Sequence, residues 1–162
     1  MNKTQLFDQL YADVARILDG KTPFRERLQA VVDLLAARVP HYDWVGFYIA
    51  DPASPPMLVL GPYCGEATEH VRIPFGAGVC GRAAADRKVF VVQDIRRETN
   101  YLSCSPNVLA EIVLPIFRGA DVWGELDIDS HTAAPFTGED GAFLGRVCAL
   151  VAAKVATGEA GP

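Results

Sequence analysis

The order in which hydrophobic periods follow one another along the chain constrains its fold most strongly. Apolar residues recur at helical spacing over residues 3–19 and 23–39, and again over residues 138–157. Between them, residues 43–129 consist of short runs rich in β-branched and aromatic residues, separated by Gly, Pro, Asp and Ser. This order predicts an α+β fold in which N- and C-terminal helices pack on a central antiparallel sheet.

The sheet is expected to contain about six strands. A short helix is predicted over residues 78–86 after a Gly-rich turn, and residues 94–109 form a polar connection of a length that often serves as a lid or binding loop. The whole chain, residues 1–162, has the usual length of one domain. The predicted strands lie near residues 43–50, 57–61, 68–73, 89–93, 110–117 and 121–129.

Composition and charge exclude several classes of function. Fifteen basic residues against twenty acidic ones give a net charge of -5, which opposes binding to a nucleic-acid backbone. The longest apolar runs fall far short of the ~20 residues that a membrane span needs. The start MNKTQLFDQL lacks the apolar stretch and cleavage site of a secretory signal. We therefore expect a cytoplasmic protein without nucleic-acid or membrane partners.

The cysteines are expected to do nucleophilic or redox chemistry rather than to bind a metal. The four cysteines contain no CxxC pair, and the three histidines lie at none of the usual zinc spacings, so no metal site is expected. In a reducing cytoplasm a functional thiol is a nucleophile or a redox group rather than part of a permanent crosslink. Cys64, in a predicted turn, and Cys148, within the last predicted helix, are interpreted as structural.

Cys80 and Cys104 are the candidates for that chemistry. Cys80 lies in GAGVCGRAA, where the glycines permit a tight turn and the alanines indicate a helix that begins just after the cysteine. A helix N-terminus stabilises a thiolate, but a small side chain filling a gap beneath the turn explains Cys80 equally well. Cys104 lies in the polar loop NYLSCSPN, a setting that favours a reactive thiol over a buried structural one.

Acidic residues are predicted to gather on one face of the last strand. Like charges at this spacing repel unless solvent, a metal or a cationic ligand compensates them, or unless one is held protonated by its neighbours. Glu111 opens the neighbouring predicted strand and is expected to approach the same place. A solvated outer face is the alternative, chiefly for Glu125. Alternation places Trp123, Glu125, Asp127 and Asp129 on one face, opposite Val122, Gly124, Leu126 and Ile128.

An aromatic pair is predicted on the strand DWVGFYIA. Trp44, Gly46 and Tyr48 point to one face, and Val45, Phe47 and Ile49 point to the core. Two rings that flank a glycine leave space for a small ligand between them, although packing against a helix is the commoner use of such residues.

Several segments together resemble the free methionine-(R)-sulfoxide reductases, which have a GAF fold. The likeness runs from the first predicted helix to the last, and the specific combination is GVCG, a second cysteine 24 positions later, EIVLP and LDIDS. The matching segments are WVGFY, LVLGPYCGE, VRIPFGAGVCG, AEIVLPI and GELDIDS, in this order and at this spacing.

The resemblance implies an enzyme that reduces free methionine-(R)-sulfoxide to methionine without a bound cofactor. The loop cysteine of the family is the nucleophile, which corresponds to Cys104, and the GVCG cysteine, Cys80, resolves the sulfenic acid as a disulfide. A thioredoxin-type reductant would reopen that disulfide. The substrate methyl group would lie against Trp44 and Tyr48. The carboxylates near its amino group would be Glu111, Asp127 and Asp129, which leaves Glu125 outside the motif.

This sequence departs from the family pattern at a few positions. His70 stands where many members carry a further cysteine, and Ala110 stands where Ser is usual before EIVLP. The nucleophile usually follows Ile-Ala and precedes Asp, whereas Leu102 and Ser103 precede Cys104 here and Ser105 follows it. The main alternative is a non-enzymatic GAF module that binds a small ligand or senses oxidants. A relative that keeps the fold and has lost turnover is a third possibility, and a homodimer is implied by the resemblance alone.

Overall fold

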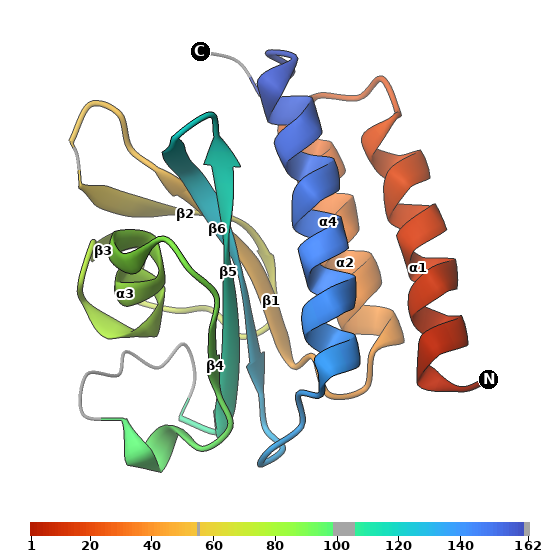
Figure 1. Cartoon of the computed structure of the whole chain (residues 1–162), viewed down its shortest axis with the longest axis vertical. Coiled ribbons are helices and arrows are strands. Elements are labelled where there is room, and N and C mark those ends of the chain that lie inside the picture. Colours follow the sequence, from red (N-terminus) through yellow and green to blue (C-terminus); the bar gives the residue numbers. More distant parts are fainter. Residues whose placement is uncertain (55, 99–105, 161–162) are drawn as a thin grey trace.

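The computed structural model describes residues 1–54, 56–98 and 106–160, which form a six-stranded antiparallel sheet with helices on both faces (Figure 1). The predicted α+β fold with terminal helices on an antiparallel sheet is confirmed. The elements are α1 (Lys3–Leu18), α2 (Phe24–Arg38), β1 (Trp44–Ala50), β2 (Met57–Cys64), β3 (Arg72–Pro74), α3 (Gly78–Asp86), β4 (Phe90–Val92), a short 3-10 helix (Ile95–Arg97), β5 (Ala110–Arg118), β6 (Asp121–Ser130) and α4 (Gly138–Ala156).

The sheet has the strand order β3-β2-β1-β6-β5-β4, so that β1 and β6, far apart in the sequence, lie side by side at its centre. All neighbouring strands are antiparallel. In this register Trp44 lies opposite Asp129, and Glu111 of β5 lies on the other side of the same Asp129. The central strands therefore bring residues from three distant segments onto one face.

The terminal helices cover the other face of the sheet. Helices α2 and α4 pack against the strands, and α1 packs on α2 and α4 as an outer layer (Figure 1). Capping boxes fix where two helices begin: Asn2 with Gln5 at α1, and Thr137 with Asp140 at α4. These helices and the sheet form a large apolar core, which holds the strands in place on the face opposite α3.

A second, smaller core lies on the opposite face, beneath α3. The helix spans Gly78–Asp86, which confirms the range predicted for it. It does not begin just after Cys80, as the alanines alone indicated, because the backbone N–H of Gly81 already donates to the carbonyl of Ala77. Cys80 therefore lies within the first turn. Gly81 sits so close to the turn after β3 that a Cβ atom there would come within 2.4 Å of the carbonyl oxygen of Pro74.

The simple alternation predicted for β6 is wrong at its first residues. The register between β5 and β6 shifts between Ile116 and Phe117, as expected of a β-bulge. Phe117 pairs with Val122 and Ile116 with Gly124, so Trp123 is the extra residue on β6. Val122 packs in the core beneath α3. Trp123 instead packs with the terminal helices, where its ring meets that of Phe24 edge-on. From Gly124 onward the predicted faces hold.

Other boundaries differ by a few residues. The strand predicted over 68–73 is displaced to Arg72–Pro74, because the hydroxyl of Thr68 accepts from the N–H of His70 and holds a turn there. Cys64 ends β2 instead of lying in a turn. None of the helices in the described part of the chain is long and apolar enough to cross a membrane.

Candidate active site

Acidic side chains gather on the sheet face that α3 covers. β6 supplies three of them and β5 supplies one, and all are at most 2% exposed. Glu125, for which a solvated outer face was the alternative, is thus buried. Below α3 the set lies in a largely apolar environment, where unpaired charge is costly. Its members are Glu111, Glu125, Asp127 and Asp129.

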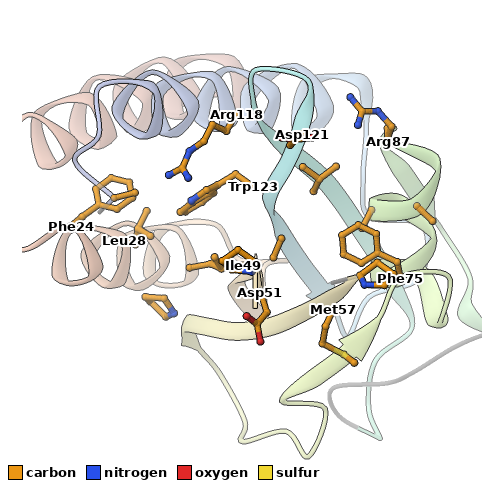
Figure 2. A pocket seen from close by; sticks show the side chains of 18 of the residues that line it. Phe24, Leu28, Ile49, Asp51, Met57, Phe75, Arg87, Arg118, Asp121 and Trp123 are labelled. Atoms are coloured by element: carbon orange, nitrogen blue, oxygen red, sulfur yellow. The ribbon is translucent and has the colours of Figure 1, made fainter. Parts of the chain in front are cut away.

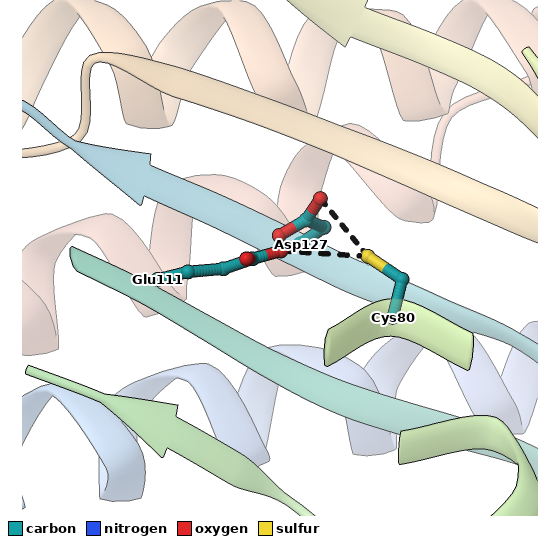
Figure 3. A group of neighbouring side chains, drawn as sticks. All are labelled: Cys80, Glu111 and Asp127. Atoms are coloured by element: carbon teal, nitrogen blue, oxygen red, sulfur yellow. Dashed lines mark hydrogen bonds between the residues drawn. The ribbon is translucent and has the colours of Figure 1, made fainter. Parts of the chain in front are cut away.

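Cys80 points from the first turn of α3 onto this acidic face. Its sulfur donates to Oδ2 of Asp127 over 3.2 Å and, more weakly, to Oε1 of Glu111 over 3.5 Å (Figure 3). The thiol is 5% exposed. The structure therefore brings together Cys80, Glu111 and Asp127 from three separate elements, and we call these three residues the acid–thiol cluster.

Burial determines the protonation of this cluster. The pKa of Glu111 is raised well above its ordinary value, first by burial and then by the negative charges of Asp127 and Asp129. Burial also raises the pKa of Asp127, but hydrogen bonds with Glu111 and Cys80 oppose that shift. Glu111 is consequently the carboxyl that keeps its proton, and Asp127 accepts the shorter hydrogen bond from Cys80. A neutral carboxylic acid can donate a proton at a pH where an exposed glutamate could not.

Glu125 extends the acidic face toward Tyr48, which lies opposite it on β1. Burial raises its pKa well above the ordinary value, and the charge of Asp127 raises it further, while the nearby Cys80 thiol partly opposes the shift. Neither of its carboxyl oxygens has a hydrogen-bond partner among the described residues. A buried polar group without a partner costs free energy, so its presence calls for an explanation.

Two aromatic side chains border the acidic face on β1. Trp44 and Tyr48 stack with ring centroids 6.3 Å apart. The indole N–H of Trp44 donates to the carbonyl of Glu66, and the hydroxyl of Tyr48 donates to the carbonyl of His70, so both rings are held in place. The sequence did not reveal these anchors, since any residue type supplies a backbone carbonyl.

The space predicted between the two rings is not open. A Cβ atom on Gly46 would come within 2.3 Å of the Trp44 ring, so the indole itself fills the gap that the missing side chain leaves. Gly46 therefore lets Trp44 lie flat across the strand. Both rings are buried, so the described residues leave no open face of this aromatic pair to a ligand.

A pocket lies at the other end of the same strands. It has a volume of about 770 Å³ and is lined mainly by apolar side chains, such as Trp123, and by the charged residues Arg118 and Asp121 (Figure 2). None of the four buried acidic residues and neither Cys80 nor Trp44 lines it. The acid–thiol cluster is thus separate from this pocket.

The remaining predicted residues fall into three groups. Cys104, with Ser103 and Ser105, lies outside the described residues. Ala110 faces the core of the terminal helices, so its side chain points away from the acidic face. Cys148 lies in that same core, where burial raises the pKa of its thiol to about 12 and keeps it protonated, in keeping with a structural role. Its position explains why it takes no part in the site.

Residues 23–155 match the model of the GAF domain family. The chain belongs to the GAF domain family. The "Free methionine-R-sulfoxide reductase" of Escherichia coli is 36% identical to this GAF protein over 97% of the chain and 93% of the relative. The solved structure of a free methionine-R-sulfoxide reductase from Neisseria meningitidis, in complex with its substrate, superposes with a TM-score of 0.89. It is 31% identical and is matched over 95% of this chain and 90% of its own.

A third neighbour of this GAF protein carries a different description. It is a putative GAF sensor protein from Burkholderia vietnamiensis, with a TM-score of 0.89, 28% identity and coverage of 99% of both chains. The predicted family is confirmed. Proteins described as a reductase and as a putative sensor are therefore both represented among proteins of the same fold.

Proposed function

We propose that this GAF-domain protein reduces free methionine-(R)-sulfoxide to methionine. The observation that carries the proposal is the acid–thiol cluster, in which a neutral Glu111 lies beside Asp127 and the Cys80 thiol. All three residues are buried beneath α3. The similarity to the Escherichia coli and Neisseria meningitidis reductases supports the same substrate. The proposed sites of methyl and amino recognition lie on the same face of the sheet.

The substrate has an apolar end, a polar sulfoxide and a zwitterionic end, and the site offers a partner for each of these. The methyl end lies against Trp44 and Tyr48, whose polar atoms are already bound to carbonyl groups. The ammonium group approaches Asp127 and Asp129, because carboxylates in a buried setting favour a cation strongly. This arrangement explains a preference for the free amino acid, since a peptide bond removes the ammonium charge.

The chemical step transfers oxygen from one sulfur to another. The Cys104 thiolate attacks the electrophilic sulfur of the sulfoxide while Glu111 supplies a proton to its oxygen. The sulfur–oxygen bond of the substrate breaks, two electrons pass from the cysteine to methionine, and Cys104 leaves as a sulfenic acid. The oxygen atom on Cys104 then carries the proton that Glu111 supplied, and Glu111 recovers a proton from the solvent, to which the Cys104 thiol released its own proton when the thiolate formed.

Cys80 resolves the sulfenic acid. Its thiol, which donates to Asp127, gives its proton to that carboxylate and attacks the sulfur of Cys104. The hydroxyl leaves with a proton as water, and a disulfide joins the two cysteines. A thioredoxin-type dithiol in the cytoplasm then restores both thiols by exchange and is itself oxidised. No bound cofactor takes part.

Single-turnover experiments on the cysteine variants test this scheme. Cys80→Ser, reduced and freed of reductant, should form one methionine per chain and then stop, because Cys104 is oxidised and cannot be resolved. Cys104→Ser should form none. Cys148→Ser, which changes a buried cysteine outside the site, should behave as the wild type. Equal methionine yields from Cys104→Ser and wild type would exclude Cys104 as the nucleophile.

A redox-sensing GAF module is the second candidate, and the likeness to the Burkholderia vietnamiensis protein favours it. Such a module would form the Cys80–Cys104 disulfide with an oxidant such as hydrogen peroxide but would not convert methionine sulfoxide. Disulfide formation by peroxide together with zero methionine from reduced wild-type protein would select this candidate.

A further inference from the structure

The acid–thiol cluster has the ligand types and spacing of a metal site. In the described part of the chain, one ligand atom each from Cys80, Glu111 and Asp127 lies within 4.8 Å of the other two, and all three residues are buried. Zinc takes thiolate at about 2.3 Å and carboxylate oxygen at about 2.0 Å in a tetrahedron, so a sulfur and an oxygen ligand lie about 3.5 Å apart. The measured separations are 3.5 Å from the Cys80 sulfur to Glu111 and 3.2 Å to Asp127.

We propose that Cys80, Glu111 and Asp127 bind a divalent cation of the zinc class. One sulfur and two oxygen ligands suit Zn²⁺ and its substitute Co²⁺. Mg²⁺ and Ca²⁺ take six or more oxygens, and a thiol at the centre of the cluster cannot serve them. Cys80 binds as the thiolate and Glu111 as the carboxylate, and both release their protons to the buffer.

Unsatisfied polar atoms around the cluster point to such a ligand independently. Oε2 of Glu111 and both carboxyl oxygens of Glu125 are buried without a hydrogen-bond partner in the described chain. Glu125 lies on the same face as the cluster, two residues before Asp127 on β6, and interacts with both Asp127 and the Cys80 thiol. A cation seated between Cys80 and the carboxylates would satisfy these oxygens directly or through a bound water in its fourth position.

A cation here would compete with the proposed reductase chemistry, and this consequence rests on the proposed function. It would occupy the thiol that resolves the sulfenic acid and the carboxyl that donates a proton. Binding would therefore inhibit turnover reversibly, and a chelator would restore it. The sequence predicts no metal site because its ligands come from α3, β5 and β6 and share no local spacing.

Cobalt absorption tests the proposal without any reference to activity. Reduced full-length protein carrying Cys104→Ser, so that this second thiol cannot act as a donor, is titrated with Co²⁺. We expect a sulfur-to-cobalt charge-transfer band in the near ultraviolet, which Zn²⁺ abolishes by displacement. Adding Cys80→Ser should remove the band, whereas adding Cys64→Ser or Cys148→Ser should preserve it.

The carboxylates provide a second measurement. Loss of an outer-shell partner of a metal ligand typically weakens affinity 10- to 100-fold, so loss of a ligand in Glu111→Gln or Asp127→Asn should raise the Kd for Zn²⁺ about tenfold or more. The exposed Glu26→Gln serves as the matched control and should leave the Kd unchanged. Circular dichroism establishes that each variant is folded.

Two results would overturn the metal site: no charge-transfer band in folded, reduced protein, or an undiminished band after Cys80→Ser. Reductase turnover does not enter either readout. A protein that binds Co²⁺ through Cys80 but yields no methionine would refute the proposed function alone. A protein that turns over and shows no band would refute the metal site alone.

Discussion

At the scale of single residues, position within the fold makes Glu111 an acid. Burial and the neighbouring charges of Asp127 and Asp129 raise the pKa of Glu111, so it stays protonated while exposed carboxyls of the same protein are ionised. Its neighbour Glu125 shares the raised pKa but has no hydrogen-bond partner among the described residues. The two glutamates therefore lead to different predictions, one for catalysis and one for stability.

Replacement of Glu111 by glutamine should remove the proposed proton donor while keeping the shape of the side chain. General acids contribute factors of about 10²–10⁴ to rate, so we expect kcat of Glu111→Gln to fall about 100-fold or more. In the wild type, kcat should decline as pH rises through the raised pKa of Glu111, because the proton is then lost. Turnover measured from acid to alkaline pH should show that decline in the wild type and not in Glu111→Gln. The same alkaline limb in both proteins would assign the proton to another group.

Replacement of Glu125 by methionine should stabilise the protein, since an apolar side chain suits this buried position better than an unpartnered carboxyl. A buried unsatisfied group costs roughly 1–3 kcal/mol, and the gain should approach that value. Because the pKa of Glu125 is raised in the folded state, the unfolded state ionises first, and wild-type stability falls as pH rises above about 4. Urea unfolding should thus show a larger gain at pH 8 than at pH 4. A loss of stability at both pH values would show that Glu125 makes a favourable contact.

At the scale of elements, the position of α3 decides where the Cys80 sulfur points. The helix is seated by the close approach of Gly81 to the turn after β3, and Gly76 in that turn has a positive φ of 93°. Sequence patterns located α3 over residues 78–86 and the strands beneath it, but they did not reveal the close approach of Gly81 to Pro74, which depends on tertiary packing. They also missed the bulge that turns Trp123 away from the site, since alternation assumes an unbroken ladder.

Gly81→Ala should displace α3 from its position against the turn after β3 and destabilise the protein. The added Cβ would lie 2.4 Å from a backbone oxygen of Pro74 that cannot rotate away, so the helix must shift, at a cost of about 1–3 kcal/mol. Gly145→Ala, on the exposed side of α4, meets nothing within 4 Å and should instead gain about 0.5–1 kcal/mol from helix propensity. Thermal unfolding of both variants measures the contrast. Equal stability of Gly81→Ala and wild type would mean that α3 tolerates displacement, and Cys80 would then not be held rigidly.

At the scale of the whole molecule, one sheet separates two environments. The face under α1, α2 and α4 is an apolar core, which the helical and alternating periods of the sequence predicted well. The face under α3 combines an apolar core with four buried acidic side chains, and the sequence indicated three of these together through alternation on one strand. Their depth of burial and their contact with Cys80 depend on tertiary packing, which no local pattern records. The site is thus built by the fold from residues 31 and 47 positions away from Cys80.

Turnover of free methionine-(R)-sulfoxide by the reduced wild-type protein with thioredoxin, thioredoxin reductase and NADPH tests the central claim most directly. The free (S) epimer and a peptide-bound (R)-sulfoxide are measured in parallel. The account predicts sustained NADPH oxidation and methionine formation with the free (R) form alone, because only that substrate presents an ammonium group to Asp127 and Asp129 with the sulfoxide oxygen toward Glu111. Equal turnover of the peptide-bound sulfoxide, or no turnover of any substrate by folded protein with reduced thiols, would contradict it.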